Sequence, residues 1–515
     1  MIGPQVGARD SRSPGRWRSR LPGLLAAVAA LVSAIWVAAL LLRRVDGLSA
    51  PPYDLAFFQQ VVWNVGERGQ WVSDFHEGSF LGLHFSPILV IPALVERFLW
   101  SDVRVLVLLH AAAVAALVPA AFLFLRATFR PSRAAGTLAA ALAIGLPFWG
   151  SMQDVIRSDF HPETAGVVLA LLAGWAGLTR RPRAMWALGL VALATREDVA
   201  YAVAVIGIVV AVRGRGDLRW HGRRLAASAV AWAIVVFGIV MPWIRGGLAS
   251  DTDRYYAWLG GGLGVFAAPF TMTDAGVSAL THPAAWFVVV GMVASLVLLP
   301  LLRPRWFVLV LPPLFALLLS TNWFQSGIRL QYSLILVVPL LVATGMGGRR
   351  AIAATLRLRG SRRRRREGAQ AAQPGARRWS RRLTGPVLMV ATIPALAGAW
   401  IQGSLPPFDP ADPAFFDRPA SIDRLLLVAA GVPSSARLLV DEGLVAPLAG
   451  RVSVGRMAGV IPPGDSYALV DRLAWSPTSR IARSRSTVIE ALLRSNTRPI
   501  LVDDGRFVLW GPERP

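Results

Sequence analysis

Residues 21–42 read LPGLLAAVAALVSAIWVAALLL, an uncharged and almost wholly apolar run. A helix needs about 20 mostly apolar residues to cross a bilayer, so this run is long enough for one span. Five arginines precede it, at positions 9, 12, 16, 18 and 20. The run is longer than the core of a usual signal peptide, and no A-x-A site follows it cleanly. We therefore expect a retained signal-anchor helix with a cytoplasmic N-terminus.

Further apolar stretches predict a mainly α-helical, polytopic integral membrane protein with about eleven transmembrane helices. The predicted spans lie near 21–42, 104–125, 134–150, 164–178, 184–195, 199–212, 225–244, 285–302, 306–321, 333–346 and 383–401. Arg196, Glu197 and Asp198 interrupt the pair at 184–212. That pair is either a helical hairpin or one long kinked helix.

The composition supports a membrane protein over a soluble enzyme. The chain has 515 residues, of which 54% are apolar and 16% charged, and its mean hydropathy is +0.51. Soluble domains carry about 25% charged residues. Cysteine is absent, which excludes disulfides, thiol catalysis and zinc–thiolate sites. Lysine is absent too, which excludes a Walker loop, and no H-E-x-x-H motif is present.

The net charge of +24 first raises the question of nucleic acid, but its distribution indicates membrane orientation instead. With the N-terminus inside, the predicted cytoplasmic segments hold 31 arginines and three acids. The outer loops and spans up to residue 401 hold ten arginines and fifteen acids. This is the bias of the positive-inside rule. We expect a plasma-membrane protein that binds no nucleic acid, whose basic run Arg362–Arg366 contacts anionic lipid.

The predicted domains follow from these spans. Residues 1–20 form a basic cytoplasmic N-terminus, and residues 21–401 form the transmembrane domain. That domain has a large first outer loop (43–103) and a basic cytoplasmic loop (347–382). Residues 402–515 begin with a Pro/Asp-rich linker, after which short apolar runs alternate with helix-like stretches. They predict a small α/β domain on the extracytoplasmic face.

Two outer loops concentrate ionisable residues. The first carries Asp54 and His84, and its part Pro87–Trp100 suits a helix lying in the membrane interface. The second, residues 151–163, reads SMQDVIRSDFHPE and carries Arg157. In an extended segment, residues at spacing two lie on one side. The acids and histidine at Asp159, His161 and Glu163 could therefore converge on Mg²⁺ or Mn²⁺, or position a nucleophile, which makes Asp159 a candidate catalytic residue. The alternative is a charged loop end that only marks the water interface.

His84 and Arg157 are candidates for substrate binding, and so are charged residues further along the chain. Ionisable residues at membrane depth are costly and suggest function, which applies to Arg196, Glu197 and Asp198. At the tip of a hairpin, however, these three would simply face water. Arg245 and Arg329 lie at later outer loops, where a guanidinium could contact phosphate oxygens.

Four segments resemble the signature blocks of a prokaryotic membrane family, domain of unknown function 2079 (DUF2079). They are YDLAFFQQVVWN (53–64), HFSPILVIPAL (84–94), SDFHPETAGVVLALL (158–172) and ATREDVAYAVAVIGIVV (194–210). That family is grouped by resemblance with the GT-C glycosyltransferases, which use polyprenyl-phosphate sugars on the outer face of the membrane. The resemblance implies a GT-C-like fold, a lipid-linked sugar donor and an extracytoplasmic acceptor.

The resemblance also implies roles for individual residues. Asp54 matches the first-loop acid and would be the general base for the acceptor hydroxyl. Asp159, His161 and Glu163 match the second-loop site, which would bind a metal or the donor phosphate. The block at 196–198 matches the family's basic-acidic-acidic block. Many GT-C members pair two acids in the first loop, whereas Leu55 follows Asp54 here.

Two other classes of function stay open at this point. A lipid or solute transporter would place its ionisable residues along a path through the membrane midplane. An assembly factor of the cell envelope would use the C-terminal domain to bind partners. A glycosyltransferase instead requires Asp54, Asp159, His161 and Glu163 to converge in an outward cavity.

Overall fold

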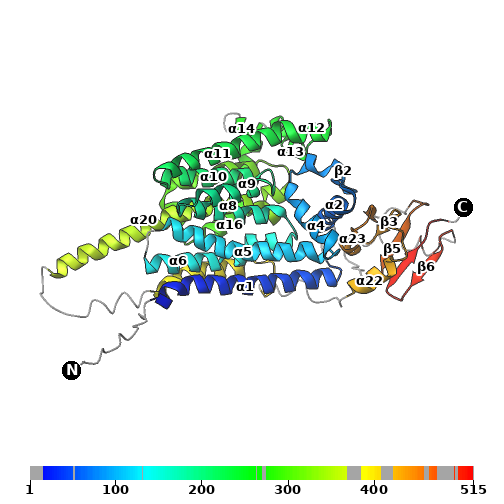
Figure 1. Cartoon of the computed structure of the whole chain (residues 1–515), viewed down its shortest axis with the longest axis horizontal. Helices are drawn as coiled ribbons and strands as arrows, with labels where there is room; N and C mark the ends of the chain where they lie inside the picture. The colour runs from blue at the N-terminus through cyan, green and yellow to red at the C-terminus, as the bar shows by residue number, and fades with distance from the viewer. Residues whose placement is uncertain are drawn as a thin grey trace, which may run out of the picture.

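A computed structural model describes residues 16–49, 53–129, 132–262, 264–268, 274–367, 384–407, 421–457, 463–472, 492, 494 and 497–513. It is a long helical bundle with a small domain at one end that contains a mixed sheet (Figure 1). The predicted fold class is confirmed, since the described chain is mainly helical, offers several membrane spans and ends in a mixed sheet.

Five helices of the described chain are long and apolar enough to cross a membrane, and a bent pair adds a sixth. The five are Arg20–Asp46, Arg104–Thr128, Asp217–Arg245, Gly276–Ser295 and Leu330–Thr355, and the pair is Ala134–Phe148 with Gly150–Arg157. Shorter apolar helices are Pro162–Leu178, Pro182–Leu193, Val199–Arg213 and Pro304–Leu318. Together with the helix Thr384–Gln402, these elements overlap every predicted span, but only five helices and the bent pair of the described chain are long and apolar enough for a span, against about eleven predicted.

The helices of the bundle decide two predictions, the hairpin or kinked helix at 184–212 and the loop at 151–163. Its main helices are α1 (Arg16–Asp46), α5 (Arg104–Thr128), α6 (Arg133–Ile144), α7 (Gly150–Arg157), α8 (Pro162–Leu178), α9 (Pro182–Leu193), α10 (Val199–Arg213), α11 (Asp217–Val235), α12 (Met241–Arg245), α16 (Pro283–Ser295), α17 (Pro304–Phe307), α18 (Leu311–Leu318), α20 (Leu334–Glu367) and α21 (Thr384–Gln402). Residues 184–212 form a hairpin, because α9 and α10 are separate helices. The expected loop 151–163 was wrong in part, because α7 occupies its first half.

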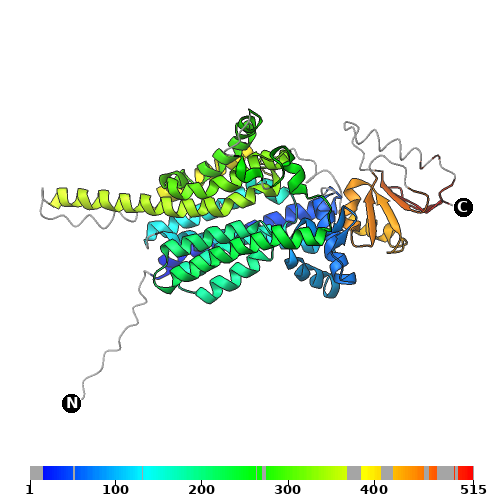
Figure 2. The same ribbon diagram turned by 90° about the horizontal axis from the view of Figure 1, so that it is seen from above.

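Shorter elements connect these helices. They include α13 (Asp251–Tyr255), α14 (Gly264–Ala267), α15 (Asp274–Leu280), α19 (Trp323–Ser326) and the 3-10 turn η7 (Leu330–Ser333). Figures 1 and 2 show that α1 begins and α20 ends at the same end of the bundle. The C-terminal domain lies at the opposite end. The arginine-rich start of α1 and end of α20, both predicted to be cytoplasmic, therefore lie at the end away from the C-terminal domain.

The first loop folds into its own small layer. It contains α2 (Asp54–Arg68), β1 (Val72–Ser73), β2 (His76–Ser79), α3 (Phe80–Leu83), the 3-10 turn η1 (Pro87–Leu89) and α4 (Val90–Phe98). Most of α2 is buried, because α4 packs on one side and the C-terminal domain on another. Gln59 Nε2 donates to Glu96 Oε2 of α4 at 2.9 Å, and Gln60 Nε2 donates to the carbonyl of Arg451 at 3.4 Å. The middle of α2 is thus held from both sides.

The C-terminal domain is built around a five-stranded sheet. Its elements are α22 (Ile422–Ala429), β3 (Arg437–Val440), α23 (Glu442–Leu448), β4 (Ser453–Arg456), β5 (Tyr467–Asp471), β6 (Ile500–Asp503) and β7 (Phe507–Trp510). The strand order is β4-β3-β5-β7-β6. β3 pairs in parallel with β4 and β5, and β7 pairs antiparallel with β5 and β6. Every strand coincides with one of the short runs expected after residue 402. A further expected stretch, Thr487–Ser495 (TVIEALLRS), lies largely outside the described residues.

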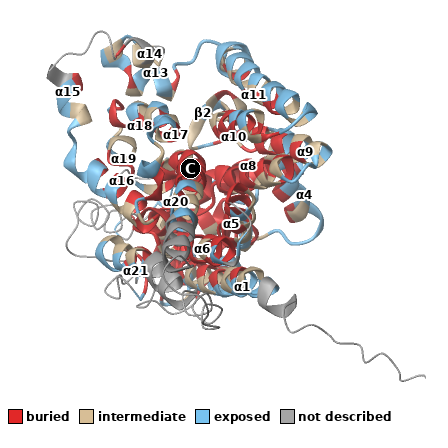
Figure 3. Cartoon of the chain, turned by 90° about the vertical axis from the view of Figure 1, so that its left-hand side faces the viewer, coloured by how far each residue is buried: buried red, intermediate tan, exposed pale blue. Residues whose placement is uncertain are grey.

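Burial follows position in the bundle. Figure 3 shows buried residues concentrated around α5, α8, α10 and α20, with exposed ones on outer helices such as α11. The outer helices keep large apolar side chains exposed, including Leu24 (60%), Ile234 (65%) and Ile239 (63%). A helix that is apolar on every side fits a lipid environment, where an exposed apolar surface has no cost. A cluster of polar groups within this apolar bundle therefore indicates a candidate functional site.

Candidate functional site

Asp54 opens α2 at the end of the bundle near the C-terminal domain. Its side chain is 34% exposed, whereas the residues that follow it in the helix are mostly buried. The N-terminus of a helix carries unpaired amide groups and the positive end of the helix dipole. That position stabilises a carboxylate while leaving it open to a ligand.

His161 faces Asp54 from the turn before α8. The distance from His161 Nε2 to Asp54 Oδ2 is 4.0 Å, and the histidine is 3% exposed. Its Nδ1 lies 3.4 Å from Ser158 Oγ and 3.3 Å from the carbonyl of Asp159. Burial lowers the pKa of His161 to about 4, with Asp54 raising it and Arg196 lowering it. The ring is therefore neutral at pH 7 and lies within electrostatic reach of both charges.

Asp159 is fully buried and is held by a cation from α1. Its Oδ1 lies 3.3 Å from Arg44 Nη1, and the same nitrogen donates to the carbonyl of Arg157 at 2.8 Å. Burial raises the pKa of Asp159 to about 6, although Arg44 opposes that rise. Oδ2 of Asp159 has no hydrogen-bond partner among the described residues. The pair joins α1 to the turn that carries His161.

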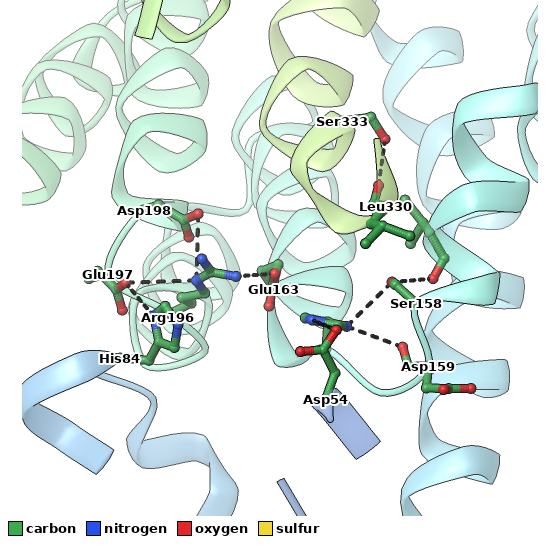
Figure 4. A network of polar contacts seen from close by, with 12 residues as sticks. Asp54, His84, Ser158, Asp159, Glu163, Arg196, Glu197, Asp198, Leu330 and Ser333 are labelled. Atoms are coloured by element: carbon green, nitrogen blue, oxygen red, sulfur yellow. Dashed lines mark hydrogen bonds and ion pairs between the residues drawn. The ribbon is translucent and has the colours of Figure 1, made fainter. Parts of the chain in front are cut away.

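A second cluster surrounds Arg196 in the turn between α9 and α10 (Figure 4). Arg196 Nη1 forms an ion pair with Glu163, and its Nε lies 3.7 Å from Glu197 Oε1 and 3.6 Å from Asp198 Oδ2. Burial alone would lower the pKa of Arg196, but these three carboxylates raise it above its ordinary value. The guanidinium therefore stays charged. Figure 4 shows Glu163 between this cluster and Asp54.

His84 of the first loop closes this cluster from the other side. Its Nδ1 lies 3.0 Å from Glu197 Oε1, and the backbone amide of Phe85 donates to Glu197 Oε2 at 2.8 Å. Burial would raise the pKa of Glu197, but His84 and Arg196 together lower it below its ordinary value. Glu197 is thus ionised, and its contacts with His84 and Phe85 hold the first loop against the α9–α10 turn.

A cavity of about 150 Å³ opens beside the second cluster. One wall is polar, with Glu163, Arg196 and Asp198, and Tyr256, Gln325, Gln331 and Tyr332 add further polar groups. The remaining lining is apolar and comes from α8, α10, α18 and the start of α20. It comprises Val167, Val199, Ala202, Pro313, Ala316, Leu317, Leu334 and Ile335. Such a two-sided cavity can hold a ligand that has both a polar and an apolar part.

The other predicted cations lie around this centre rather than in the cavity. Arg329 is half exposed, and its Nε lies 2.7 Å from Asp154 Oδ2. Arg157 donates from Nη1 to the carbonyl of Ser404 at 3.4 Å. Arg245 donates to the carbonyl of Gly82 at 3.5 Å. Arg329 directly precedes η7, which carries Gln331 and Tyr332.

The predicted metal ligands do not form a preformed metal site. No group of three or more histidines and acids suited to a metal ion occurs within the described ranges. Asp159 faces Arg44, His161 faces Asp54, and Glu163 pairs with Arg196. The expectation assumed an extended segment, but Asp159 has a left-handed backbone (φ +63°) and Glu163 lies in a helix. The three side chains therefore diverge, and no step below is assigned to a metal.

Several site residues escaped the sequence analysis. Arg44 is followed by an outer loop and looks like an ordinary boundary residue, yet it pairs with a residue 115 positions away. Gln331 and Tyr256 line the cavity from distant segments. Asp154 was noticed in the sequence, but not as the partner of Arg329. The one usable signal was a polar or charged residue at the edge of an apolar stretch, which both Arg44 and Gln331 satisfy.

Comparison with known proteins identifies the family. The family model of DUF2079, described as a predicted membrane protein, matches residues 44–490. The chain belongs to this family. No curated protein matches the chain.

Three solved structures are among those similar to this chain. ArnT from Cupriavidus metallidurans, bound to undecaprenyl phosphate, has 13% identity and a TM-score of 0.46, over 97% of this chain and 98% of that one. The arabinofuranosyltransferase AftD from Mycobacteria has 14% identity and a TM-score of 0.47, over 99% of this chain and 41% of that one. AglB, an oligosaccharyltransferase from Archaeoglobus fulgidus in complex with an inhibitory peptide and a dolichol-phosphate, has 11% identity and a TM-score of 0.40, over 88% of this chain and 70% of that one. These similarities assign no role to any residue here.

Proposed function

We propose that this member of the DUF2079 family is a membrane glycosyltransferase that moves a sugar from a polyprenyl-phosphate donor to an extracytoplasmic acceptor. The observation that carries the proposal is Asp54, a part-exposed carboxylate at a helix N-terminus, facing a neutral His161 at 4.0 Å. A carboxylate in that position is suited to take a proton from an acceptor hydroxyl. The cavity with one polar and one apolar wall is close by and suits a lipid-linked sugar.

The reaction follows from these roles. Asp54 accepts the proton of the acceptor hydroxyl, and the oxygen forms a bond to the anomeric carbon of the donor sugar. The bond from that carbon to the phosphate oxygen breaks, and the polyprenyl phosphate leaves with the electron pair. A cation stabilises the negative charge that develops on the leaving oxygen. Arg329 suits this role, because it is half exposed beside the segment that lines the cavity.

The distribution of buried charge favours this proposal over a transporter. Within the described part of the bundle and first loop, the buried charged residues gather in segments at the site end. They are Arg44, Glu96, Asp154, Asp159, Glu163 and Glu197. A transporter of charged or polar solutes would be expected to place such groups at the membrane midplane. Their concentration at one end suits a reaction at the membrane surface.

The test is complementation of a strain that lacks this protein, with Asp54→Asn compared with wild type. We expect transfer to fall by about 100-fold or more, because a general base contributes about 10²–10⁴-fold. The unused lipid-linked sugar should accumulate, as measured by mass spectrometry of extracted lipids. Glu67→Gln is the matched control, because it changes an exposed acid at the other end of the same helix. Full complementation by Asp54→Asn, with no accumulated donor, would remove Asp54 as the base.

A further inference from the structure

The polar wall of the cavity has more hydrogen-bond acceptors than the protein satisfies. Glu163 Oε2, Asp198 Oδ1 and Gln331 Oε1 are all buried and have no hydrogen-bond partner among the described residues. Glu163 is 4% exposed and Gln331 is 9% exposed, and both line the cavity. An unpaired buried acceptor costs about 1–3 kcal/mol. These oxygens have almost no surface open to the cavity, so a ligand that brings hydrogen-bond donors removes that cost when the side chains of the wall turn toward it.

The charges of the side chains that line the cavity also restrict the kind of ligand that it can bind. Its charged side chains are Arg196, Glu163 and Asp198, so a single cation faces two acids. Arg196 already pairs with Glu163 and lies 3.6 Å from Asp198 Oδ2. A negatively charged group in the cavity would meet uncompensated carboxylates at short range, where like charges repel strongly. The lining therefore disfavours an anionic ligand.

We propose that this cavity binds the sugar ring of the donor and selects an uncharged, hydroxyl-rich sugar over an acidic one. The inference rests on the proposed function and names its donor class. The sugar hydroxyls donate to Glu163, Asp198 and Gln331, while the phosphate stays outside this wall. The volume of about 150 Å³ is well below the 300–1,000 Å³ typical of cavities for drug-sized ligands, which suits a single ring.

The experiment measures binding of the full-length protein in lipid nanodiscs. The probes are a short-chain polyprenyl phosphate that carries glucose, the same lipid that carries glucuronic acid, and the bare polyprenyl phosphate. We expect wild type to bind the glucose lipid at least about tenfold more tightly than the glucuronic acid lipid. That ratio corresponds to about 1.4 kcal/mol. Equal or tighter binding of the glucuronic acid lipid would overturn the inference.

Two variants separate recognition of the sugar from retention of the lipid. Gln331→Met removes one acceptor at similar volume, and should weaken binding of the glucose lipid about tenfold while leaving the bare lipid unchanged. Glu163→Gln removes one negative charge, and should narrow the preference against glucuronic acid. Glu442→Gln, in a half-exposed ion pair of the C-terminal domain, is the control and should change neither value. Equal weakening of all three probes by Gln331→Met would contradict a contact with the sugar.

This result is separable from the outcome for the proposed function. If the sugar preference is found but no acceptor is ever glycosylated, the cavity stands and the transferase proposal fails. If transfer is found but both sugars bind alike, the transferase stands and the inference about the sugar fails.

Discussion

His161 contributes to the site as a neutral ring, and this has a consequence for stability. Its pKa is about 4 in the folded protein, whereas the ordinary pKa of an exposed histidine is 6.5. The unfolded chain therefore binds more protons between these values. The stability contributed by the neutral ring is complete above pH 6.5 and is lost as the pH falls toward 4.

We expect His161→Asn to reduce the loss of thermal stability on acidification. Wild type and variant are compared by thermal unfolding in detergent at pH 7.5 and pH 5. The wild type should lose more stability than the variant over this interval, because only the wild type has a histidine here that gains a proton on unfolding. If wild type and variant lose the same stability between pH 7.5 and pH 5, His161 does not gain a proton on unfolding as its burial requires.

The ion pair of Arg44 with Asp159 yields a second prediction at this scale. Arg44→Met should destabilise the fold by about 3–5 kcal/mol, because it leaves a buried carboxylate without its cation. The double variant Arg44→Met with Asp159→Asn should recover part of that loss. Unfolding measured for wild type, both single variants and the double variant gives the coupling. Strictly additive losses would mean that the two side chains do not stabilise each other.

The sequence predicts which single residues are candidates for the site, but not which of them contact one another. Asp54, Glu163 and Arg196 were identifiable because an ionisable side chain beside an apolar run is costly unless it has a purpose or a partner. Which of them meet could not be derived, because pairing depends on how distant helices pack. The divergence of Asp159 and Glu163 depends on one left-handed residue, and no local pattern announced it.

At the scale of elements, α4 holds α2 through a buried acid. Glu96 is 3% exposed, and burial raises its pKa to about 8, although the hydrogen bond from Gln59 opposes that rise. The folded protein therefore retains a proton that the unfolded chain releases above pH 4.5. Stability from this group is greatest at low pH and is lost as the pH rises through 8.

Glu96→Gln should remove that sensitivity. The variant keeps the shape of the side chain and stays uncharged, so we expect it to exceed wild type by about 1–3 kcal/mol at pH 9. The two proteins should be nearly equal at pH 4, below the pH of 4.5 at which the unfolded chain begins to release this proton. Unfolding of both in detergent at the two pH values is the measurement. A variant less stable than wild type at pH 9 would mean that the carboxylate is stabilised where it lies.

Helices and strands were predictable to the extent that their apolar pattern is local. The strands of the C-terminal sheet match their apolar runs because each run is short and local: β3 alternates between exposed and buried residues, whereas β5 and β7 are buried along nearly their whole length. The helix α7 was missed because SMQDVIRSDFHPE is too polar to be recognised as part of a span. Its apolar side is short, and packing against neighbouring segments completes the helix.

For the whole molecule, the positive-inside bias predicts which end faces the cytoplasm. The natural chain has no cysteine, so a single introduced cysteine is a unique label. Leu427→Cys on α22 should react with a membrane-impermeant maleimide in intact cells, because Leu427 is 77% exposed. Arg357→Cys, exposed on α20, should react only after permeabilisation. The reverse pattern would invert the orientation, and labelling of the parent chain would invalidate the assay.

The C-terminal domain is joined to the bundle by polar contacts at its first residues and at β4. The amide of Ser421 donates to the carbonyl of Asp46 at 2.8 Å, and that of Val454 donates to Asp74 Oδ2 at 2.9 Å. These contacts hold the domain over α2. Its presence was predictable from the change in composition after residue 402, but its contact with the helix that carries Asp54 was not, because docking depends on three-dimensional shape.

The helix α9 has only 12 residues and keeps Leu190 and Val191 exposed. At 1.5 Å per residue it is about 18 Å long, whereas the hydrocarbon layer is about 30 Å thick. A lipid-facing helix shorter than the layer thins the bilayer around it. Lipid headgroups beside α9 would then lie deeper, closer to the turn that carries Arg196. For the proposed transferase, lipids with shorter acyl chains should therefore ease the approach of a lipid-bound phosphate.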